Sequence, residues 1–195
     1  MRGDLTLYFV RHGETDWNAA RRLQGQTDIC LNATGRSQAA RNGQVLRTLI
    51  EDPSAVSFIS SPLARTRETM EIVRDTMGLD RTSFSFEDRL KEIHFGHWEG
   101  LTWSELPDRD PVGYQERAAD AFNWRPRGGE SYFDLTQRAA SWLADLQKSA
   151  VVVSHGGVSR VLRGYLLGLD PKEIADLSVP QDKVLVLRKG HMEWH

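Results

Sequence analysis

Short apolar runs alternate with longer amphipathic stretches along this chain. Runs of strand character occupy 5–10, 56–60, 82–86, 150–154 and 184–187, and a hairpin that adds 191–194 is the alternative to a single last strand. Apolar residues recur at helical spacing over 34–50, 62–77 and 131–148, and again from the turn at 155–157 to 167. Strands that alternate with helices predict an α/β fold, a three-layer α/β/α sandwich around a mostly parallel central sheet.

Capping residues mark where these helices begin and end. Thr34 is the expected cap of the helix to 50, and Ser131 that of the helix to 148. Ser61 and Pro62 provide a cap and a first-turn proline for the helix that Gly78 stops. The segment from 11 to 32 is predicted as a loop, and 91–130 as irregular with two short helices. No repeat or linker interrupts the chain, so we expect a single domain over 1–195.

The composition is that of a soluble globular domain. The chain has 195 residues, of which 39% are hydrophobic and 27% charged, with a net charge of −2. This charge argues against nucleic acid and against a polybasic membrane anchor as partners. No apolar run approaches the roughly 20 residues of a membrane span, and no signal peptide is evident. Cys30 is the single cysteine, and no Cys/His cluster has zinc spacing, which predicts a cytoplasmic protein without metal or cofactor.

Arginine is used in strong preference to lysine. The chain has twenty arginines and five lysines. One explanation is a GC-rich genome. The other is that guanidinium groups bind phosphate or carboxylate with two hydrogen bonds, which a lysine cannot do. Bulk composition does not decide between them, so the positions of individual arginines must.

Three predicted strands end in polar turns that carry histidine or arginine. Arg11 and His12 follow the first strand, Arg65 lies shortly after the second, and His155 follows the run 150–154. Taken singly, each has an ordinary structural explanation. In a parallel sheet, however, these turns lie at one edge, which brings two guanidiniums and two imidazoles together. Such a cluster suits a phosphate dianion better than a metal cation, and a neutral imidazole there can attack phosphorus.

The chain resembles the histidine phosphatase (phosphoglycerate mutase-like) superfamily in five blocks that occur in the family's order. They are RHGET (11–15) with Trp17, Asn18 and LQG (23–25), SSPLART (60–66), LKEIHFG (90–96), GGES (128–131) and VSHGG (153–157). The RHG triplet alone is a weak signal, whereas five ordered blocks that cover nearly the whole chain are a strong one.

The resemblance implies a role for each matching residue. His12 would be the nucleophile that forms a phosphohistidine, and Arg11, Arg65 and His155 would bind the transferring phosphoryl group. Glu92 would donate a proton to the leaving oxygen and then activate water. The expected substrate-binding residues from the same blocks are Asn18, Gln24, Gly25, Thr15 and Gly156.

The same resemblance separates two activities. Cofactor-dependent phosphoglycerate mutases typically carry arginine directly after the matching glutamate and lysine in the loop beyond, where this chain has Ile93 and Trp103. The segment 92–102 instead looks like the phosphatase branch. We therefore expect a metal-independent phosphomonoesterase that acts on small phosphorylated metabolites and releases inorganic phosphate.

Two alternatives remain open at this stage. The first is a phosphoglycerate mutase, and the second is a non-catalytic phospho-ligand binder or phosphoprotein regulator. The second is weakened because a degenerate site would have lost one of the matching residues. The sequence also leaves open whether the chain forms a homodimer.

Several residues near the expected pocket have two interpretations each. The tryptophans Trp17, Trp98, Trp103 and Trp124 either pack in the core or form an apolar rim that favours a hydrophobic leaving group. Arg125 and Arg127 either reach a second anionic group or are solvated, and we favour solvation.

Overall fold

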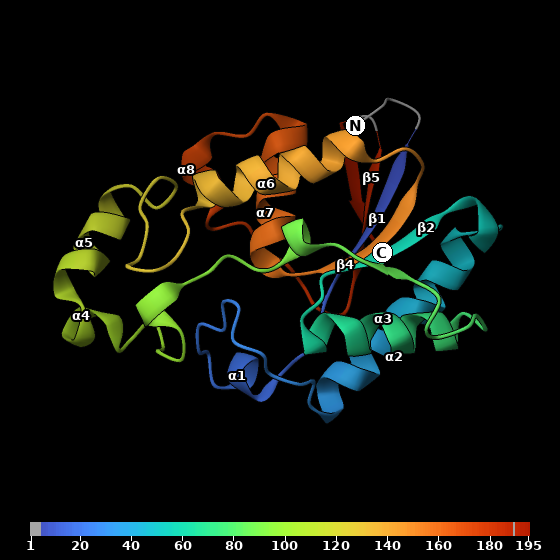
Figure 1. Ribbon diagram of the computed structural model, residues 1–195, viewed down its shortest axis with the longest axis horizontal. Coiled ribbons are helices and arrows are strands. Elements are labelled where there is room, and N and C mark those ends of the chain that lie inside the picture. The colour runs from blue at the N-terminus through green and yellow to red at the C-terminus, as the bar shows by residue number, and fades with distance from the viewer. Residues whose placement is uncertain (1–4, 189) are drawn as a thin grey trace.

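The computed structural model describes residues 5–188 and 190–195, and within them one mixed sheet runs through the centre of the molecule (Figure 1). Its strands, in the order β3-β2-β4-β1-β5-β6, are β1 (Thr6–Arg11), β2 (Ser57–Ser60), β3 (Ser85–Phe86), β4 (Ala150–Ser154), β5 (Val184–Arg188) and β6 (His191–Trp194). The first four of that order are parallel, whereas β5 pairs antiparallel with β1 and β6 with β5. The mostly parallel sheet and the terminal hairpin are thereby confirmed.

Both faces of the sheet are buried by helices, as the apolar runs predicted. One face is covered by α6 (Tyr132–Asp145), α7 (Gly156–Leu167) and α8 (Pro171–Ile174), and the other by α2 (Ala33–Leu49) and α3 (Ala64–Thr76) (Figure 1). Successive residues of a strand point to opposite faces. Accordingly Phe9 belongs to the core under α6 and α7, while its neighbours Tyr8 and Val10 belong to the core under α2 and α3. The three-layer α/β/α sandwich is confirmed.

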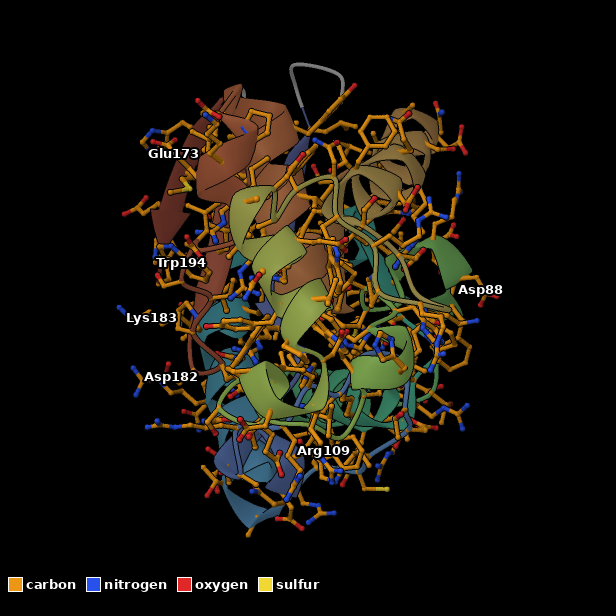
Figure 2. All side chains as sticks on the ribbon, turned by 90° about the vertical axis from the view of Figure 1, so that its left-hand side faces the viewer. Asp88, Arg109, Glu173, Asp182, Lys183 and Trp194 are labelled. Atoms are coloured by element: carbon orange, nitrogen blue, oxygen red, sulfur yellow. The ribbon has the colours of Figure 1, made fainter. Side chains whose placement is uncertain are left out.

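A smaller lobe lies beside the carboxyl ends of the parallel strands. It contains α4 (Leu106–Arg109) and α5 (Pro111–Ala119), the two short helices expected between 91 and 130, and Figure 2 shows the molecule from this end. Trp98 is completely buried there, against Leu23 and Leu106, and Trp124 stacks on it with ring centroids 4.3 Å apart. This third apolar cluster holds the lobe together, with Trp98 as a core residue and Trp124 partly buried against it.

Several predicted helix boundaries and caps differ from those in the structure. Asn32, not Thr34, caps α2 by accepting from the N–H of Gly35. The helix α3 begins at Ala64 without a side-chain cap, because the hydroxyl of Ser61 is hydrogen-bonded to His155 instead.

Short elements were also missed or overextended. The predicted loop 11–32 contains a one-turn helix, α1 (Asp16–Ala19), and α8 was not predicted. The third strand comprises Ser85–Phe86 only, although it was expected over 82–86. Short 3₁₀ turns complete the described elements at Pro53–Ala55, Asp88–Leu90 and Gly96–Trp98. No helix in the described residues has the length and apolar character needed to span a membrane.

Candidate active site

The three strand-end turns meet at one edge of the sheet, because β2, β4 and β1 are adjacent and parallel. Arg11 pairs in register with Ser154, and Ser60 with Val153. As a result the imidazoles of His12 and His155 lie with ring centroids 5.2 Å apart at an angle of 61°. A cavity of about 540 Å³ opens over this edge, with Arg11, His12, Arg65, Glu92 and Gly156 in its wall. The predicted juxtaposition is present.

His12 is held in one tautomer. Its Nδ1 lies 2.8 Å from the carbonyl oxygen of Gly13, and a carbonyl can only accept, so the hydrogen is on Nδ1 and the lone pair is on Nε2. The ring is only 2% exposed. Burial and the adjacent Arg65 and Arg11 guanidiniums hold the pKa of His12 well below its usual value. His12 is therefore neutral, with a nucleophilic nitrogen available.

The two guanidiniums are fixed by backbone carbonyls. Arg65 donates from Nη1 to Thr27 O at 2.8 Å and from Nη2 to Gly25 O at 2.7 Å, and Arg11 donates from Nη1 to Val179 O at 2.7 Å. The Nε atoms of both are buried with no hydrogen-bond partner among the described residues. Burial lowers the pKa of Arg65 and lowers that of Arg11 to about 10. Each arginine thus has a desolvated N–H left for an anionic ligand.

A segment close to the C-terminus also contacts this centre. Besides the Val179 carbonyl that binds Arg11, the side chain of Gln181 donates to the His12 carbonyl at 3.0 Å and to Asn18 Oδ1 at 3.2 Å. These contacts tie the first strand-end turn to the chain just before β5. No local pattern in the sequence predicts them.

Glu92 is held at the N-terminus of α7. The N–H of Gly157 donates to both carboxylate oxygens, at 3.0 and 3.2 Å, and the N–H of Ile93 donates to Oε1 at 2.9 Å. A Cβ on residue 157 would overlap Oε1 of Glu92, so only glycine permits this approach. Gly157 was not among the predicted site residues, yet it positions the predicted proton donor.

His155 is completely buried beside His12. Its Nε2 is 2.8 Å from Ser61 Oγ, and its Nδ1 has no partner among the described residues. Burial, Arg65 and His12 hold the pKa of His155 well below its usual value, so this ring is also neutral. It lies behind the cavity wall and is not one of the lining residues. Ser61, expected only as a helix cap, orients it.

The first loop supplies a further part of the wall. Asn18, Gln24 and Gly25 line the cavity as predicted. Thr15 does not line the cavity, although it was predicted to bind substrate. Its buried hydroxyl lies 2.9 Å from Gln24 Oε1 and accepts the N–H of Asn18, so it caps α1 and holds two of the wall residues.

Glu99 was not predicted as a site residue, and its carboxylate holds the turn 25–27 of the first loop in place. Its Oε1 accepts from the N–H groups of Gln26 and Phe95 at 3.0 and 3.1 Å. Its Oε2 accepts from the N–H and the hydroxyl of Thr27. Gly25 has a φ of +52°, and a Cβ there would overlap the Glu99 carboxylate.

This carboxylate therefore sets the position of two predicted catalytic groups. The turn 25–27 that it holds provides both carbonyls that bind Arg65. The same turn donates from Gln26 Nε2 to the backbone carbonyl of Glu92 at 3.0 Å. Glu99 thus connects the predicted phosphoryl-binding arginine with the segment of the predicted proton donor.

The remaining tryptophans and arginines differ in whether they line the cavity. Trp103 lines the cavity and is 40% exposed, whereas Trp17 packs beside Gly100 outside it. Arg125 forms an ion pair with Asp134 at 2.7 Å, and neither it nor Arg127 lines this cavity. No group of three or more metal-binding side chains occurs among the residues that the structure describes.

Comparison with known proteins gives a consistent family. The model of the histidine phosphatase superfamily (branch 1) matches residues 7–195. A protein named "Probable phosphoglycerate mutase GpmB" from Salmonella choleraesuis (strain SC-B67) is 37% identical over 170 residues, which are 85% of this chain and 76% of that protein.

Solved structures of two phosphatases are also similar. The α-ribazole phosphatase from Shigella flexneri has a TM-score of 0.81 at 26% identity, covering 98% of this chain and 95% of that one. The mycobacterial glucosyl-3-phosphoglycerate phosphatase has a TM-score of 0.79 at 29% identity, covering 98% of this chain and 97% of that one.

Proposed function

Because the chain belongs to the histidine phosphatase superfamily, branch 1, we propose that it is a metal-independent phosphomonoesterase that hydrolyses small phosphorylated metabolites through a phosphohistidine. The observation that carries this proposal is the state of His12. It is neutral, its Nδ1–H donates to the Gly13 carbonyl, and its ring lines a cavity whose wall also contains Arg11 and Arg65, whose Nε–H groups have no partner among the described residues.

In the first half-reaction, Nε2 of His12 attacks the phosphorus of the bound ester. The N–P bond forms as the bond between phosphorus and the leaving oxygen breaks, and Glu92 gives its proton to that oxygen. Arg11 and Arg65 offset the charge on the non-bridging phosphoryl oxygens. His155 was predicted to bind the phosphoryl group, but it lies behind the cavity wall, where in this proposal it packs against His12 with ring centroids 5.2 Å apart.

In the second half-reaction, the roles of the two groups reverse. Glu92, now ionised, takes a proton from water as the water oxygen attacks phosphorus. The N–P bond breaks, inorganic phosphate leaves, and His12 and Glu92 return to their starting states. The backbone N–H groups of Gly157 and Ile93 keep the carboxylate at one place through both steps.

The mutase remains the second candidate, because a relative at 37% identity carries that name. The two residues that replace the charged positions of mutases favour the phosphatase. Ile93 is 3% exposed and places an apolar side chain at the wall, and Trp103 presents a ring there. Neither carries a positive charge that would pair with the carboxylate of a phosphoglycerate.

The test is hydrolysis of p-nitrophenyl phosphate in EDTA, with labelled substrate to trap the phosphoenzyme. We expect turnover by the wild type and a loss of about 10³-fold or more in His12→Ala, which removes the nucleophile. His191→Ala, at an exposed position of β6, is the matched control and should retain activity. Absence of turnover by the wild type from acid to neutral pH would favour a phospho-ligand binder. Interconversion of 2- and 3-phosphoglycerate that depends on bisphosphoglycerate would favour the mutase.

A further inference from the structure

The cavity has more positive charge than one phosphoryl group requires. Six arginines line it, whereas its acidic lining residues are Glu92 and Asp176. Arg11 and Arg65 suffice for the phosphoryl oxygens in the proposed mechanism. The other four are called the outer arginines here because the proposed phosphoryl site does not use them, and they are Arg21, Arg22, Arg117 and Arg160.

Two of these outer arginines are held in place by neutral partners. Arg160 donates from Nε to the carbonyl of Leu177 at 2.8 Å, and the guanidinium of Arg117 lies over the ring of Trp103, 4.5 Å from its centroid. No carboxylate of the described residues is within ion-pair distance of either. Arg22, by contrast, is engaged by Glu105 at 3.6 Å and by the Gly100 carbonyl. Burial lowers the pKa of Arg117, as expected for a cation that has lost part of its hydration.

A hydroxyl group lies beside these cations. Tyr132 is 4% exposed and lines the cavity from the first turn of α6. Tyr132 and Arg160 both line the cavity, and burial raises the pKa of Tyr132 while the Arg160 guanidinium opposes that rise. Phe95 and Trp103, whose rings meet edge to face at 6.5 Å, provide apolar surface in the same wall.

We propose that Arg117, Arg160 and Tyr132 form a subsite for a second anion, so that the preferred substrate is a phosphomonoester whose leaving group carries its own carboxylate or phosphate. The proposal rests on the proposed phosphatase function and names its substrate class. A second anion would form charge-assisted hydrogen bonds with Arg117 and Arg160, which have no carboxylate partner among the described residues. The aromatic rings would contact the body of the leaving group between the two anions.

Three substrates with the same ring test this subsite. They are phenyl phosphate, 4-carboxyphenyl phosphate and benzene-1,4-diyl bisphosphate, and the last two distinguish a carboxylate from a phosphate. We expect kcat/KM of the wild type to be at least about tenfold higher for one of the doubly anionic substrates than for phenyl phosphate. This ratio should fall about tenfold in Arg117→Gln and in Arg160→Gln. Tyr132→Phe, which removes only a hydroxyl, should lower it less.

The control removes a nearby positive charge outside the cavity. Arg109 is exposed at the end of α4, is labelled in Figure 2 and does not line this cavity. Arg109→Gln should keep the wild-type ratio. A ratio near one in the wild type, or a high ratio that persists in both cavity variants, would overturn the subsite while leaving the phosphatase intact.

Binding of non-hydrolysable analogues separates the two proposals. Calorimetry compares benzylphosphonate with 4-carboxybenzylphosphonate and a 1,4-bisphosphonate of the same ring. Tighter binding of a doubly anionic analogue that is lost in Arg117→Gln supports the subsite even if no ester is hydrolysed. Equal binding of all three by the wild type counts against the subsite whatever the hydrolysis results show.

Discussion

At the scale of single residues, one buried carboxylate connects the two halves of the site. Glu99 has a side chain that is 13% exposed and accepts from four donors on the turn 25–27 and on Phe95. That turn binds Arg65 and contacts the backbone of Glu92. Glu99 is therefore a positioning residue, which acts through the arginine and does not itself contact the phosphoryl group.

Glu99→Gln should weaken binding of the phosphoryl group. An amide has one accepting oxygen, and its NH₂ group faces donors that it cannot satisfy. We expect the inhibition constant of vanadate to rise about tenfold. In a double-mutant cycle with Arg65→Lys, the combined loss should be smaller than the sum of the single losses, because both act through the same guanidinium.

The control for this prediction is Glu51→Gln, on an exposed turn remote from the site. It should leave vanadate inhibition unchanged. Strict additivity of Glu99→Gln and Arg65→Lys, with full thermal stability of both single variants, would contradict the coupling.

Sequence motifs located the residues that carry charge or react, but not those that position them. His12, Arg11, Arg65 and Glu92 stand in recognisable blocks at strand ends, and the parallel sheet brings those ends together. Glu99 binds a turn 72 and 73 residues earlier in the chain, and such a contact leaves no periodic or capping signal. Thr15 was wrongly predicted to bind substrate. It stands in the same motif as the residues of the cavity wall, and a motif does not show which of its side chains line the cavity and which lie behind the wall.

At the scale of elements, the orientation of the site depends on well-capped helices. Ser131 caps α6 by accepting from the N–H of Asp134, whose carboxylate in turn accepts from the N–H and hydroxyl of Ser131. This reciprocal pair also fixes the turn before Tyr132. The sequence predicted this cap correctly because serine directly precedes a strong amphipathic pattern.

Ser131→Ala should lower the free energy of unfolding by about 1 kcal/mol, since it removes both capping hydrogen bonds of the hydroxyl. Urea unfolding followed by circular dichroism measures the change. Ser37→Ala is the matched control, because Ser37 is exposed within α2 and its hydroxyl donates only to the Ala33 carbonyl. There the change should be within about 0.5 kcal/mol, since alanine favours a helix interior. Equal losses in the two variants would argue against the cap.

The four-residue helices α1 and α8 escaped prediction because side-chain caps define them more than periodicity does. α1 is closed by reciprocal hydrogen bonds between Thr15 and Asn18, and α8 by Asp170 with a first-turn proline. Four residues are too few for a helical repeat of apolar positions. The long helices α2, α3, α6 and α7 were predicted within a few residues because each is long enough for apolar positions to recur at helical spacing.

At the scale of the whole molecule, the two buried imidazoles make stability depend on pH. His12 and His155 both have pKa values held well below 6.5 in the folded protein, whereas in the unfolded chain both titrate near 6.5. Below that pH the unfolded state binds protons that the folded state does not. The free energy of unfolding therefore falls as the pH is lowered through 6.5, by up to about 1.4 kcal/mol per pH unit for each histidine.

Urea unfolding between pH 7.5 and 5.5 in phosphate-free buffer measures this dependence, and most carboxylates titrate below that range. We expect a clear loss of stability toward pH 5.5 in the wild type. His155→Asn should reduce the slope by the contribution of one proton. A stability that is constant across this interval would show that the folded imidazoles accept protons as readily as unfolded ones.

The contacts of Val179 and Gln181 with Arg11 and His12 have a consequence for biosynthesis. Once residue 157 has emerged from the ribosome, all three strand-end turns have emerged as well, and β1, β2 and β4 can already associate. The carbonyl that fixes Arg11 and the side chain that binds the His12 backbone emerge more than twenty residues later, just ahead of β5, which flanks β1. A nascent chain at that stage contains Arg11 and His12 but lacks Val179 and Gln181, which bind them in the folded protein. The contacts that anchor Arg11 and the His12 backbone can thus form only after the strands that carry these residues have been synthesised.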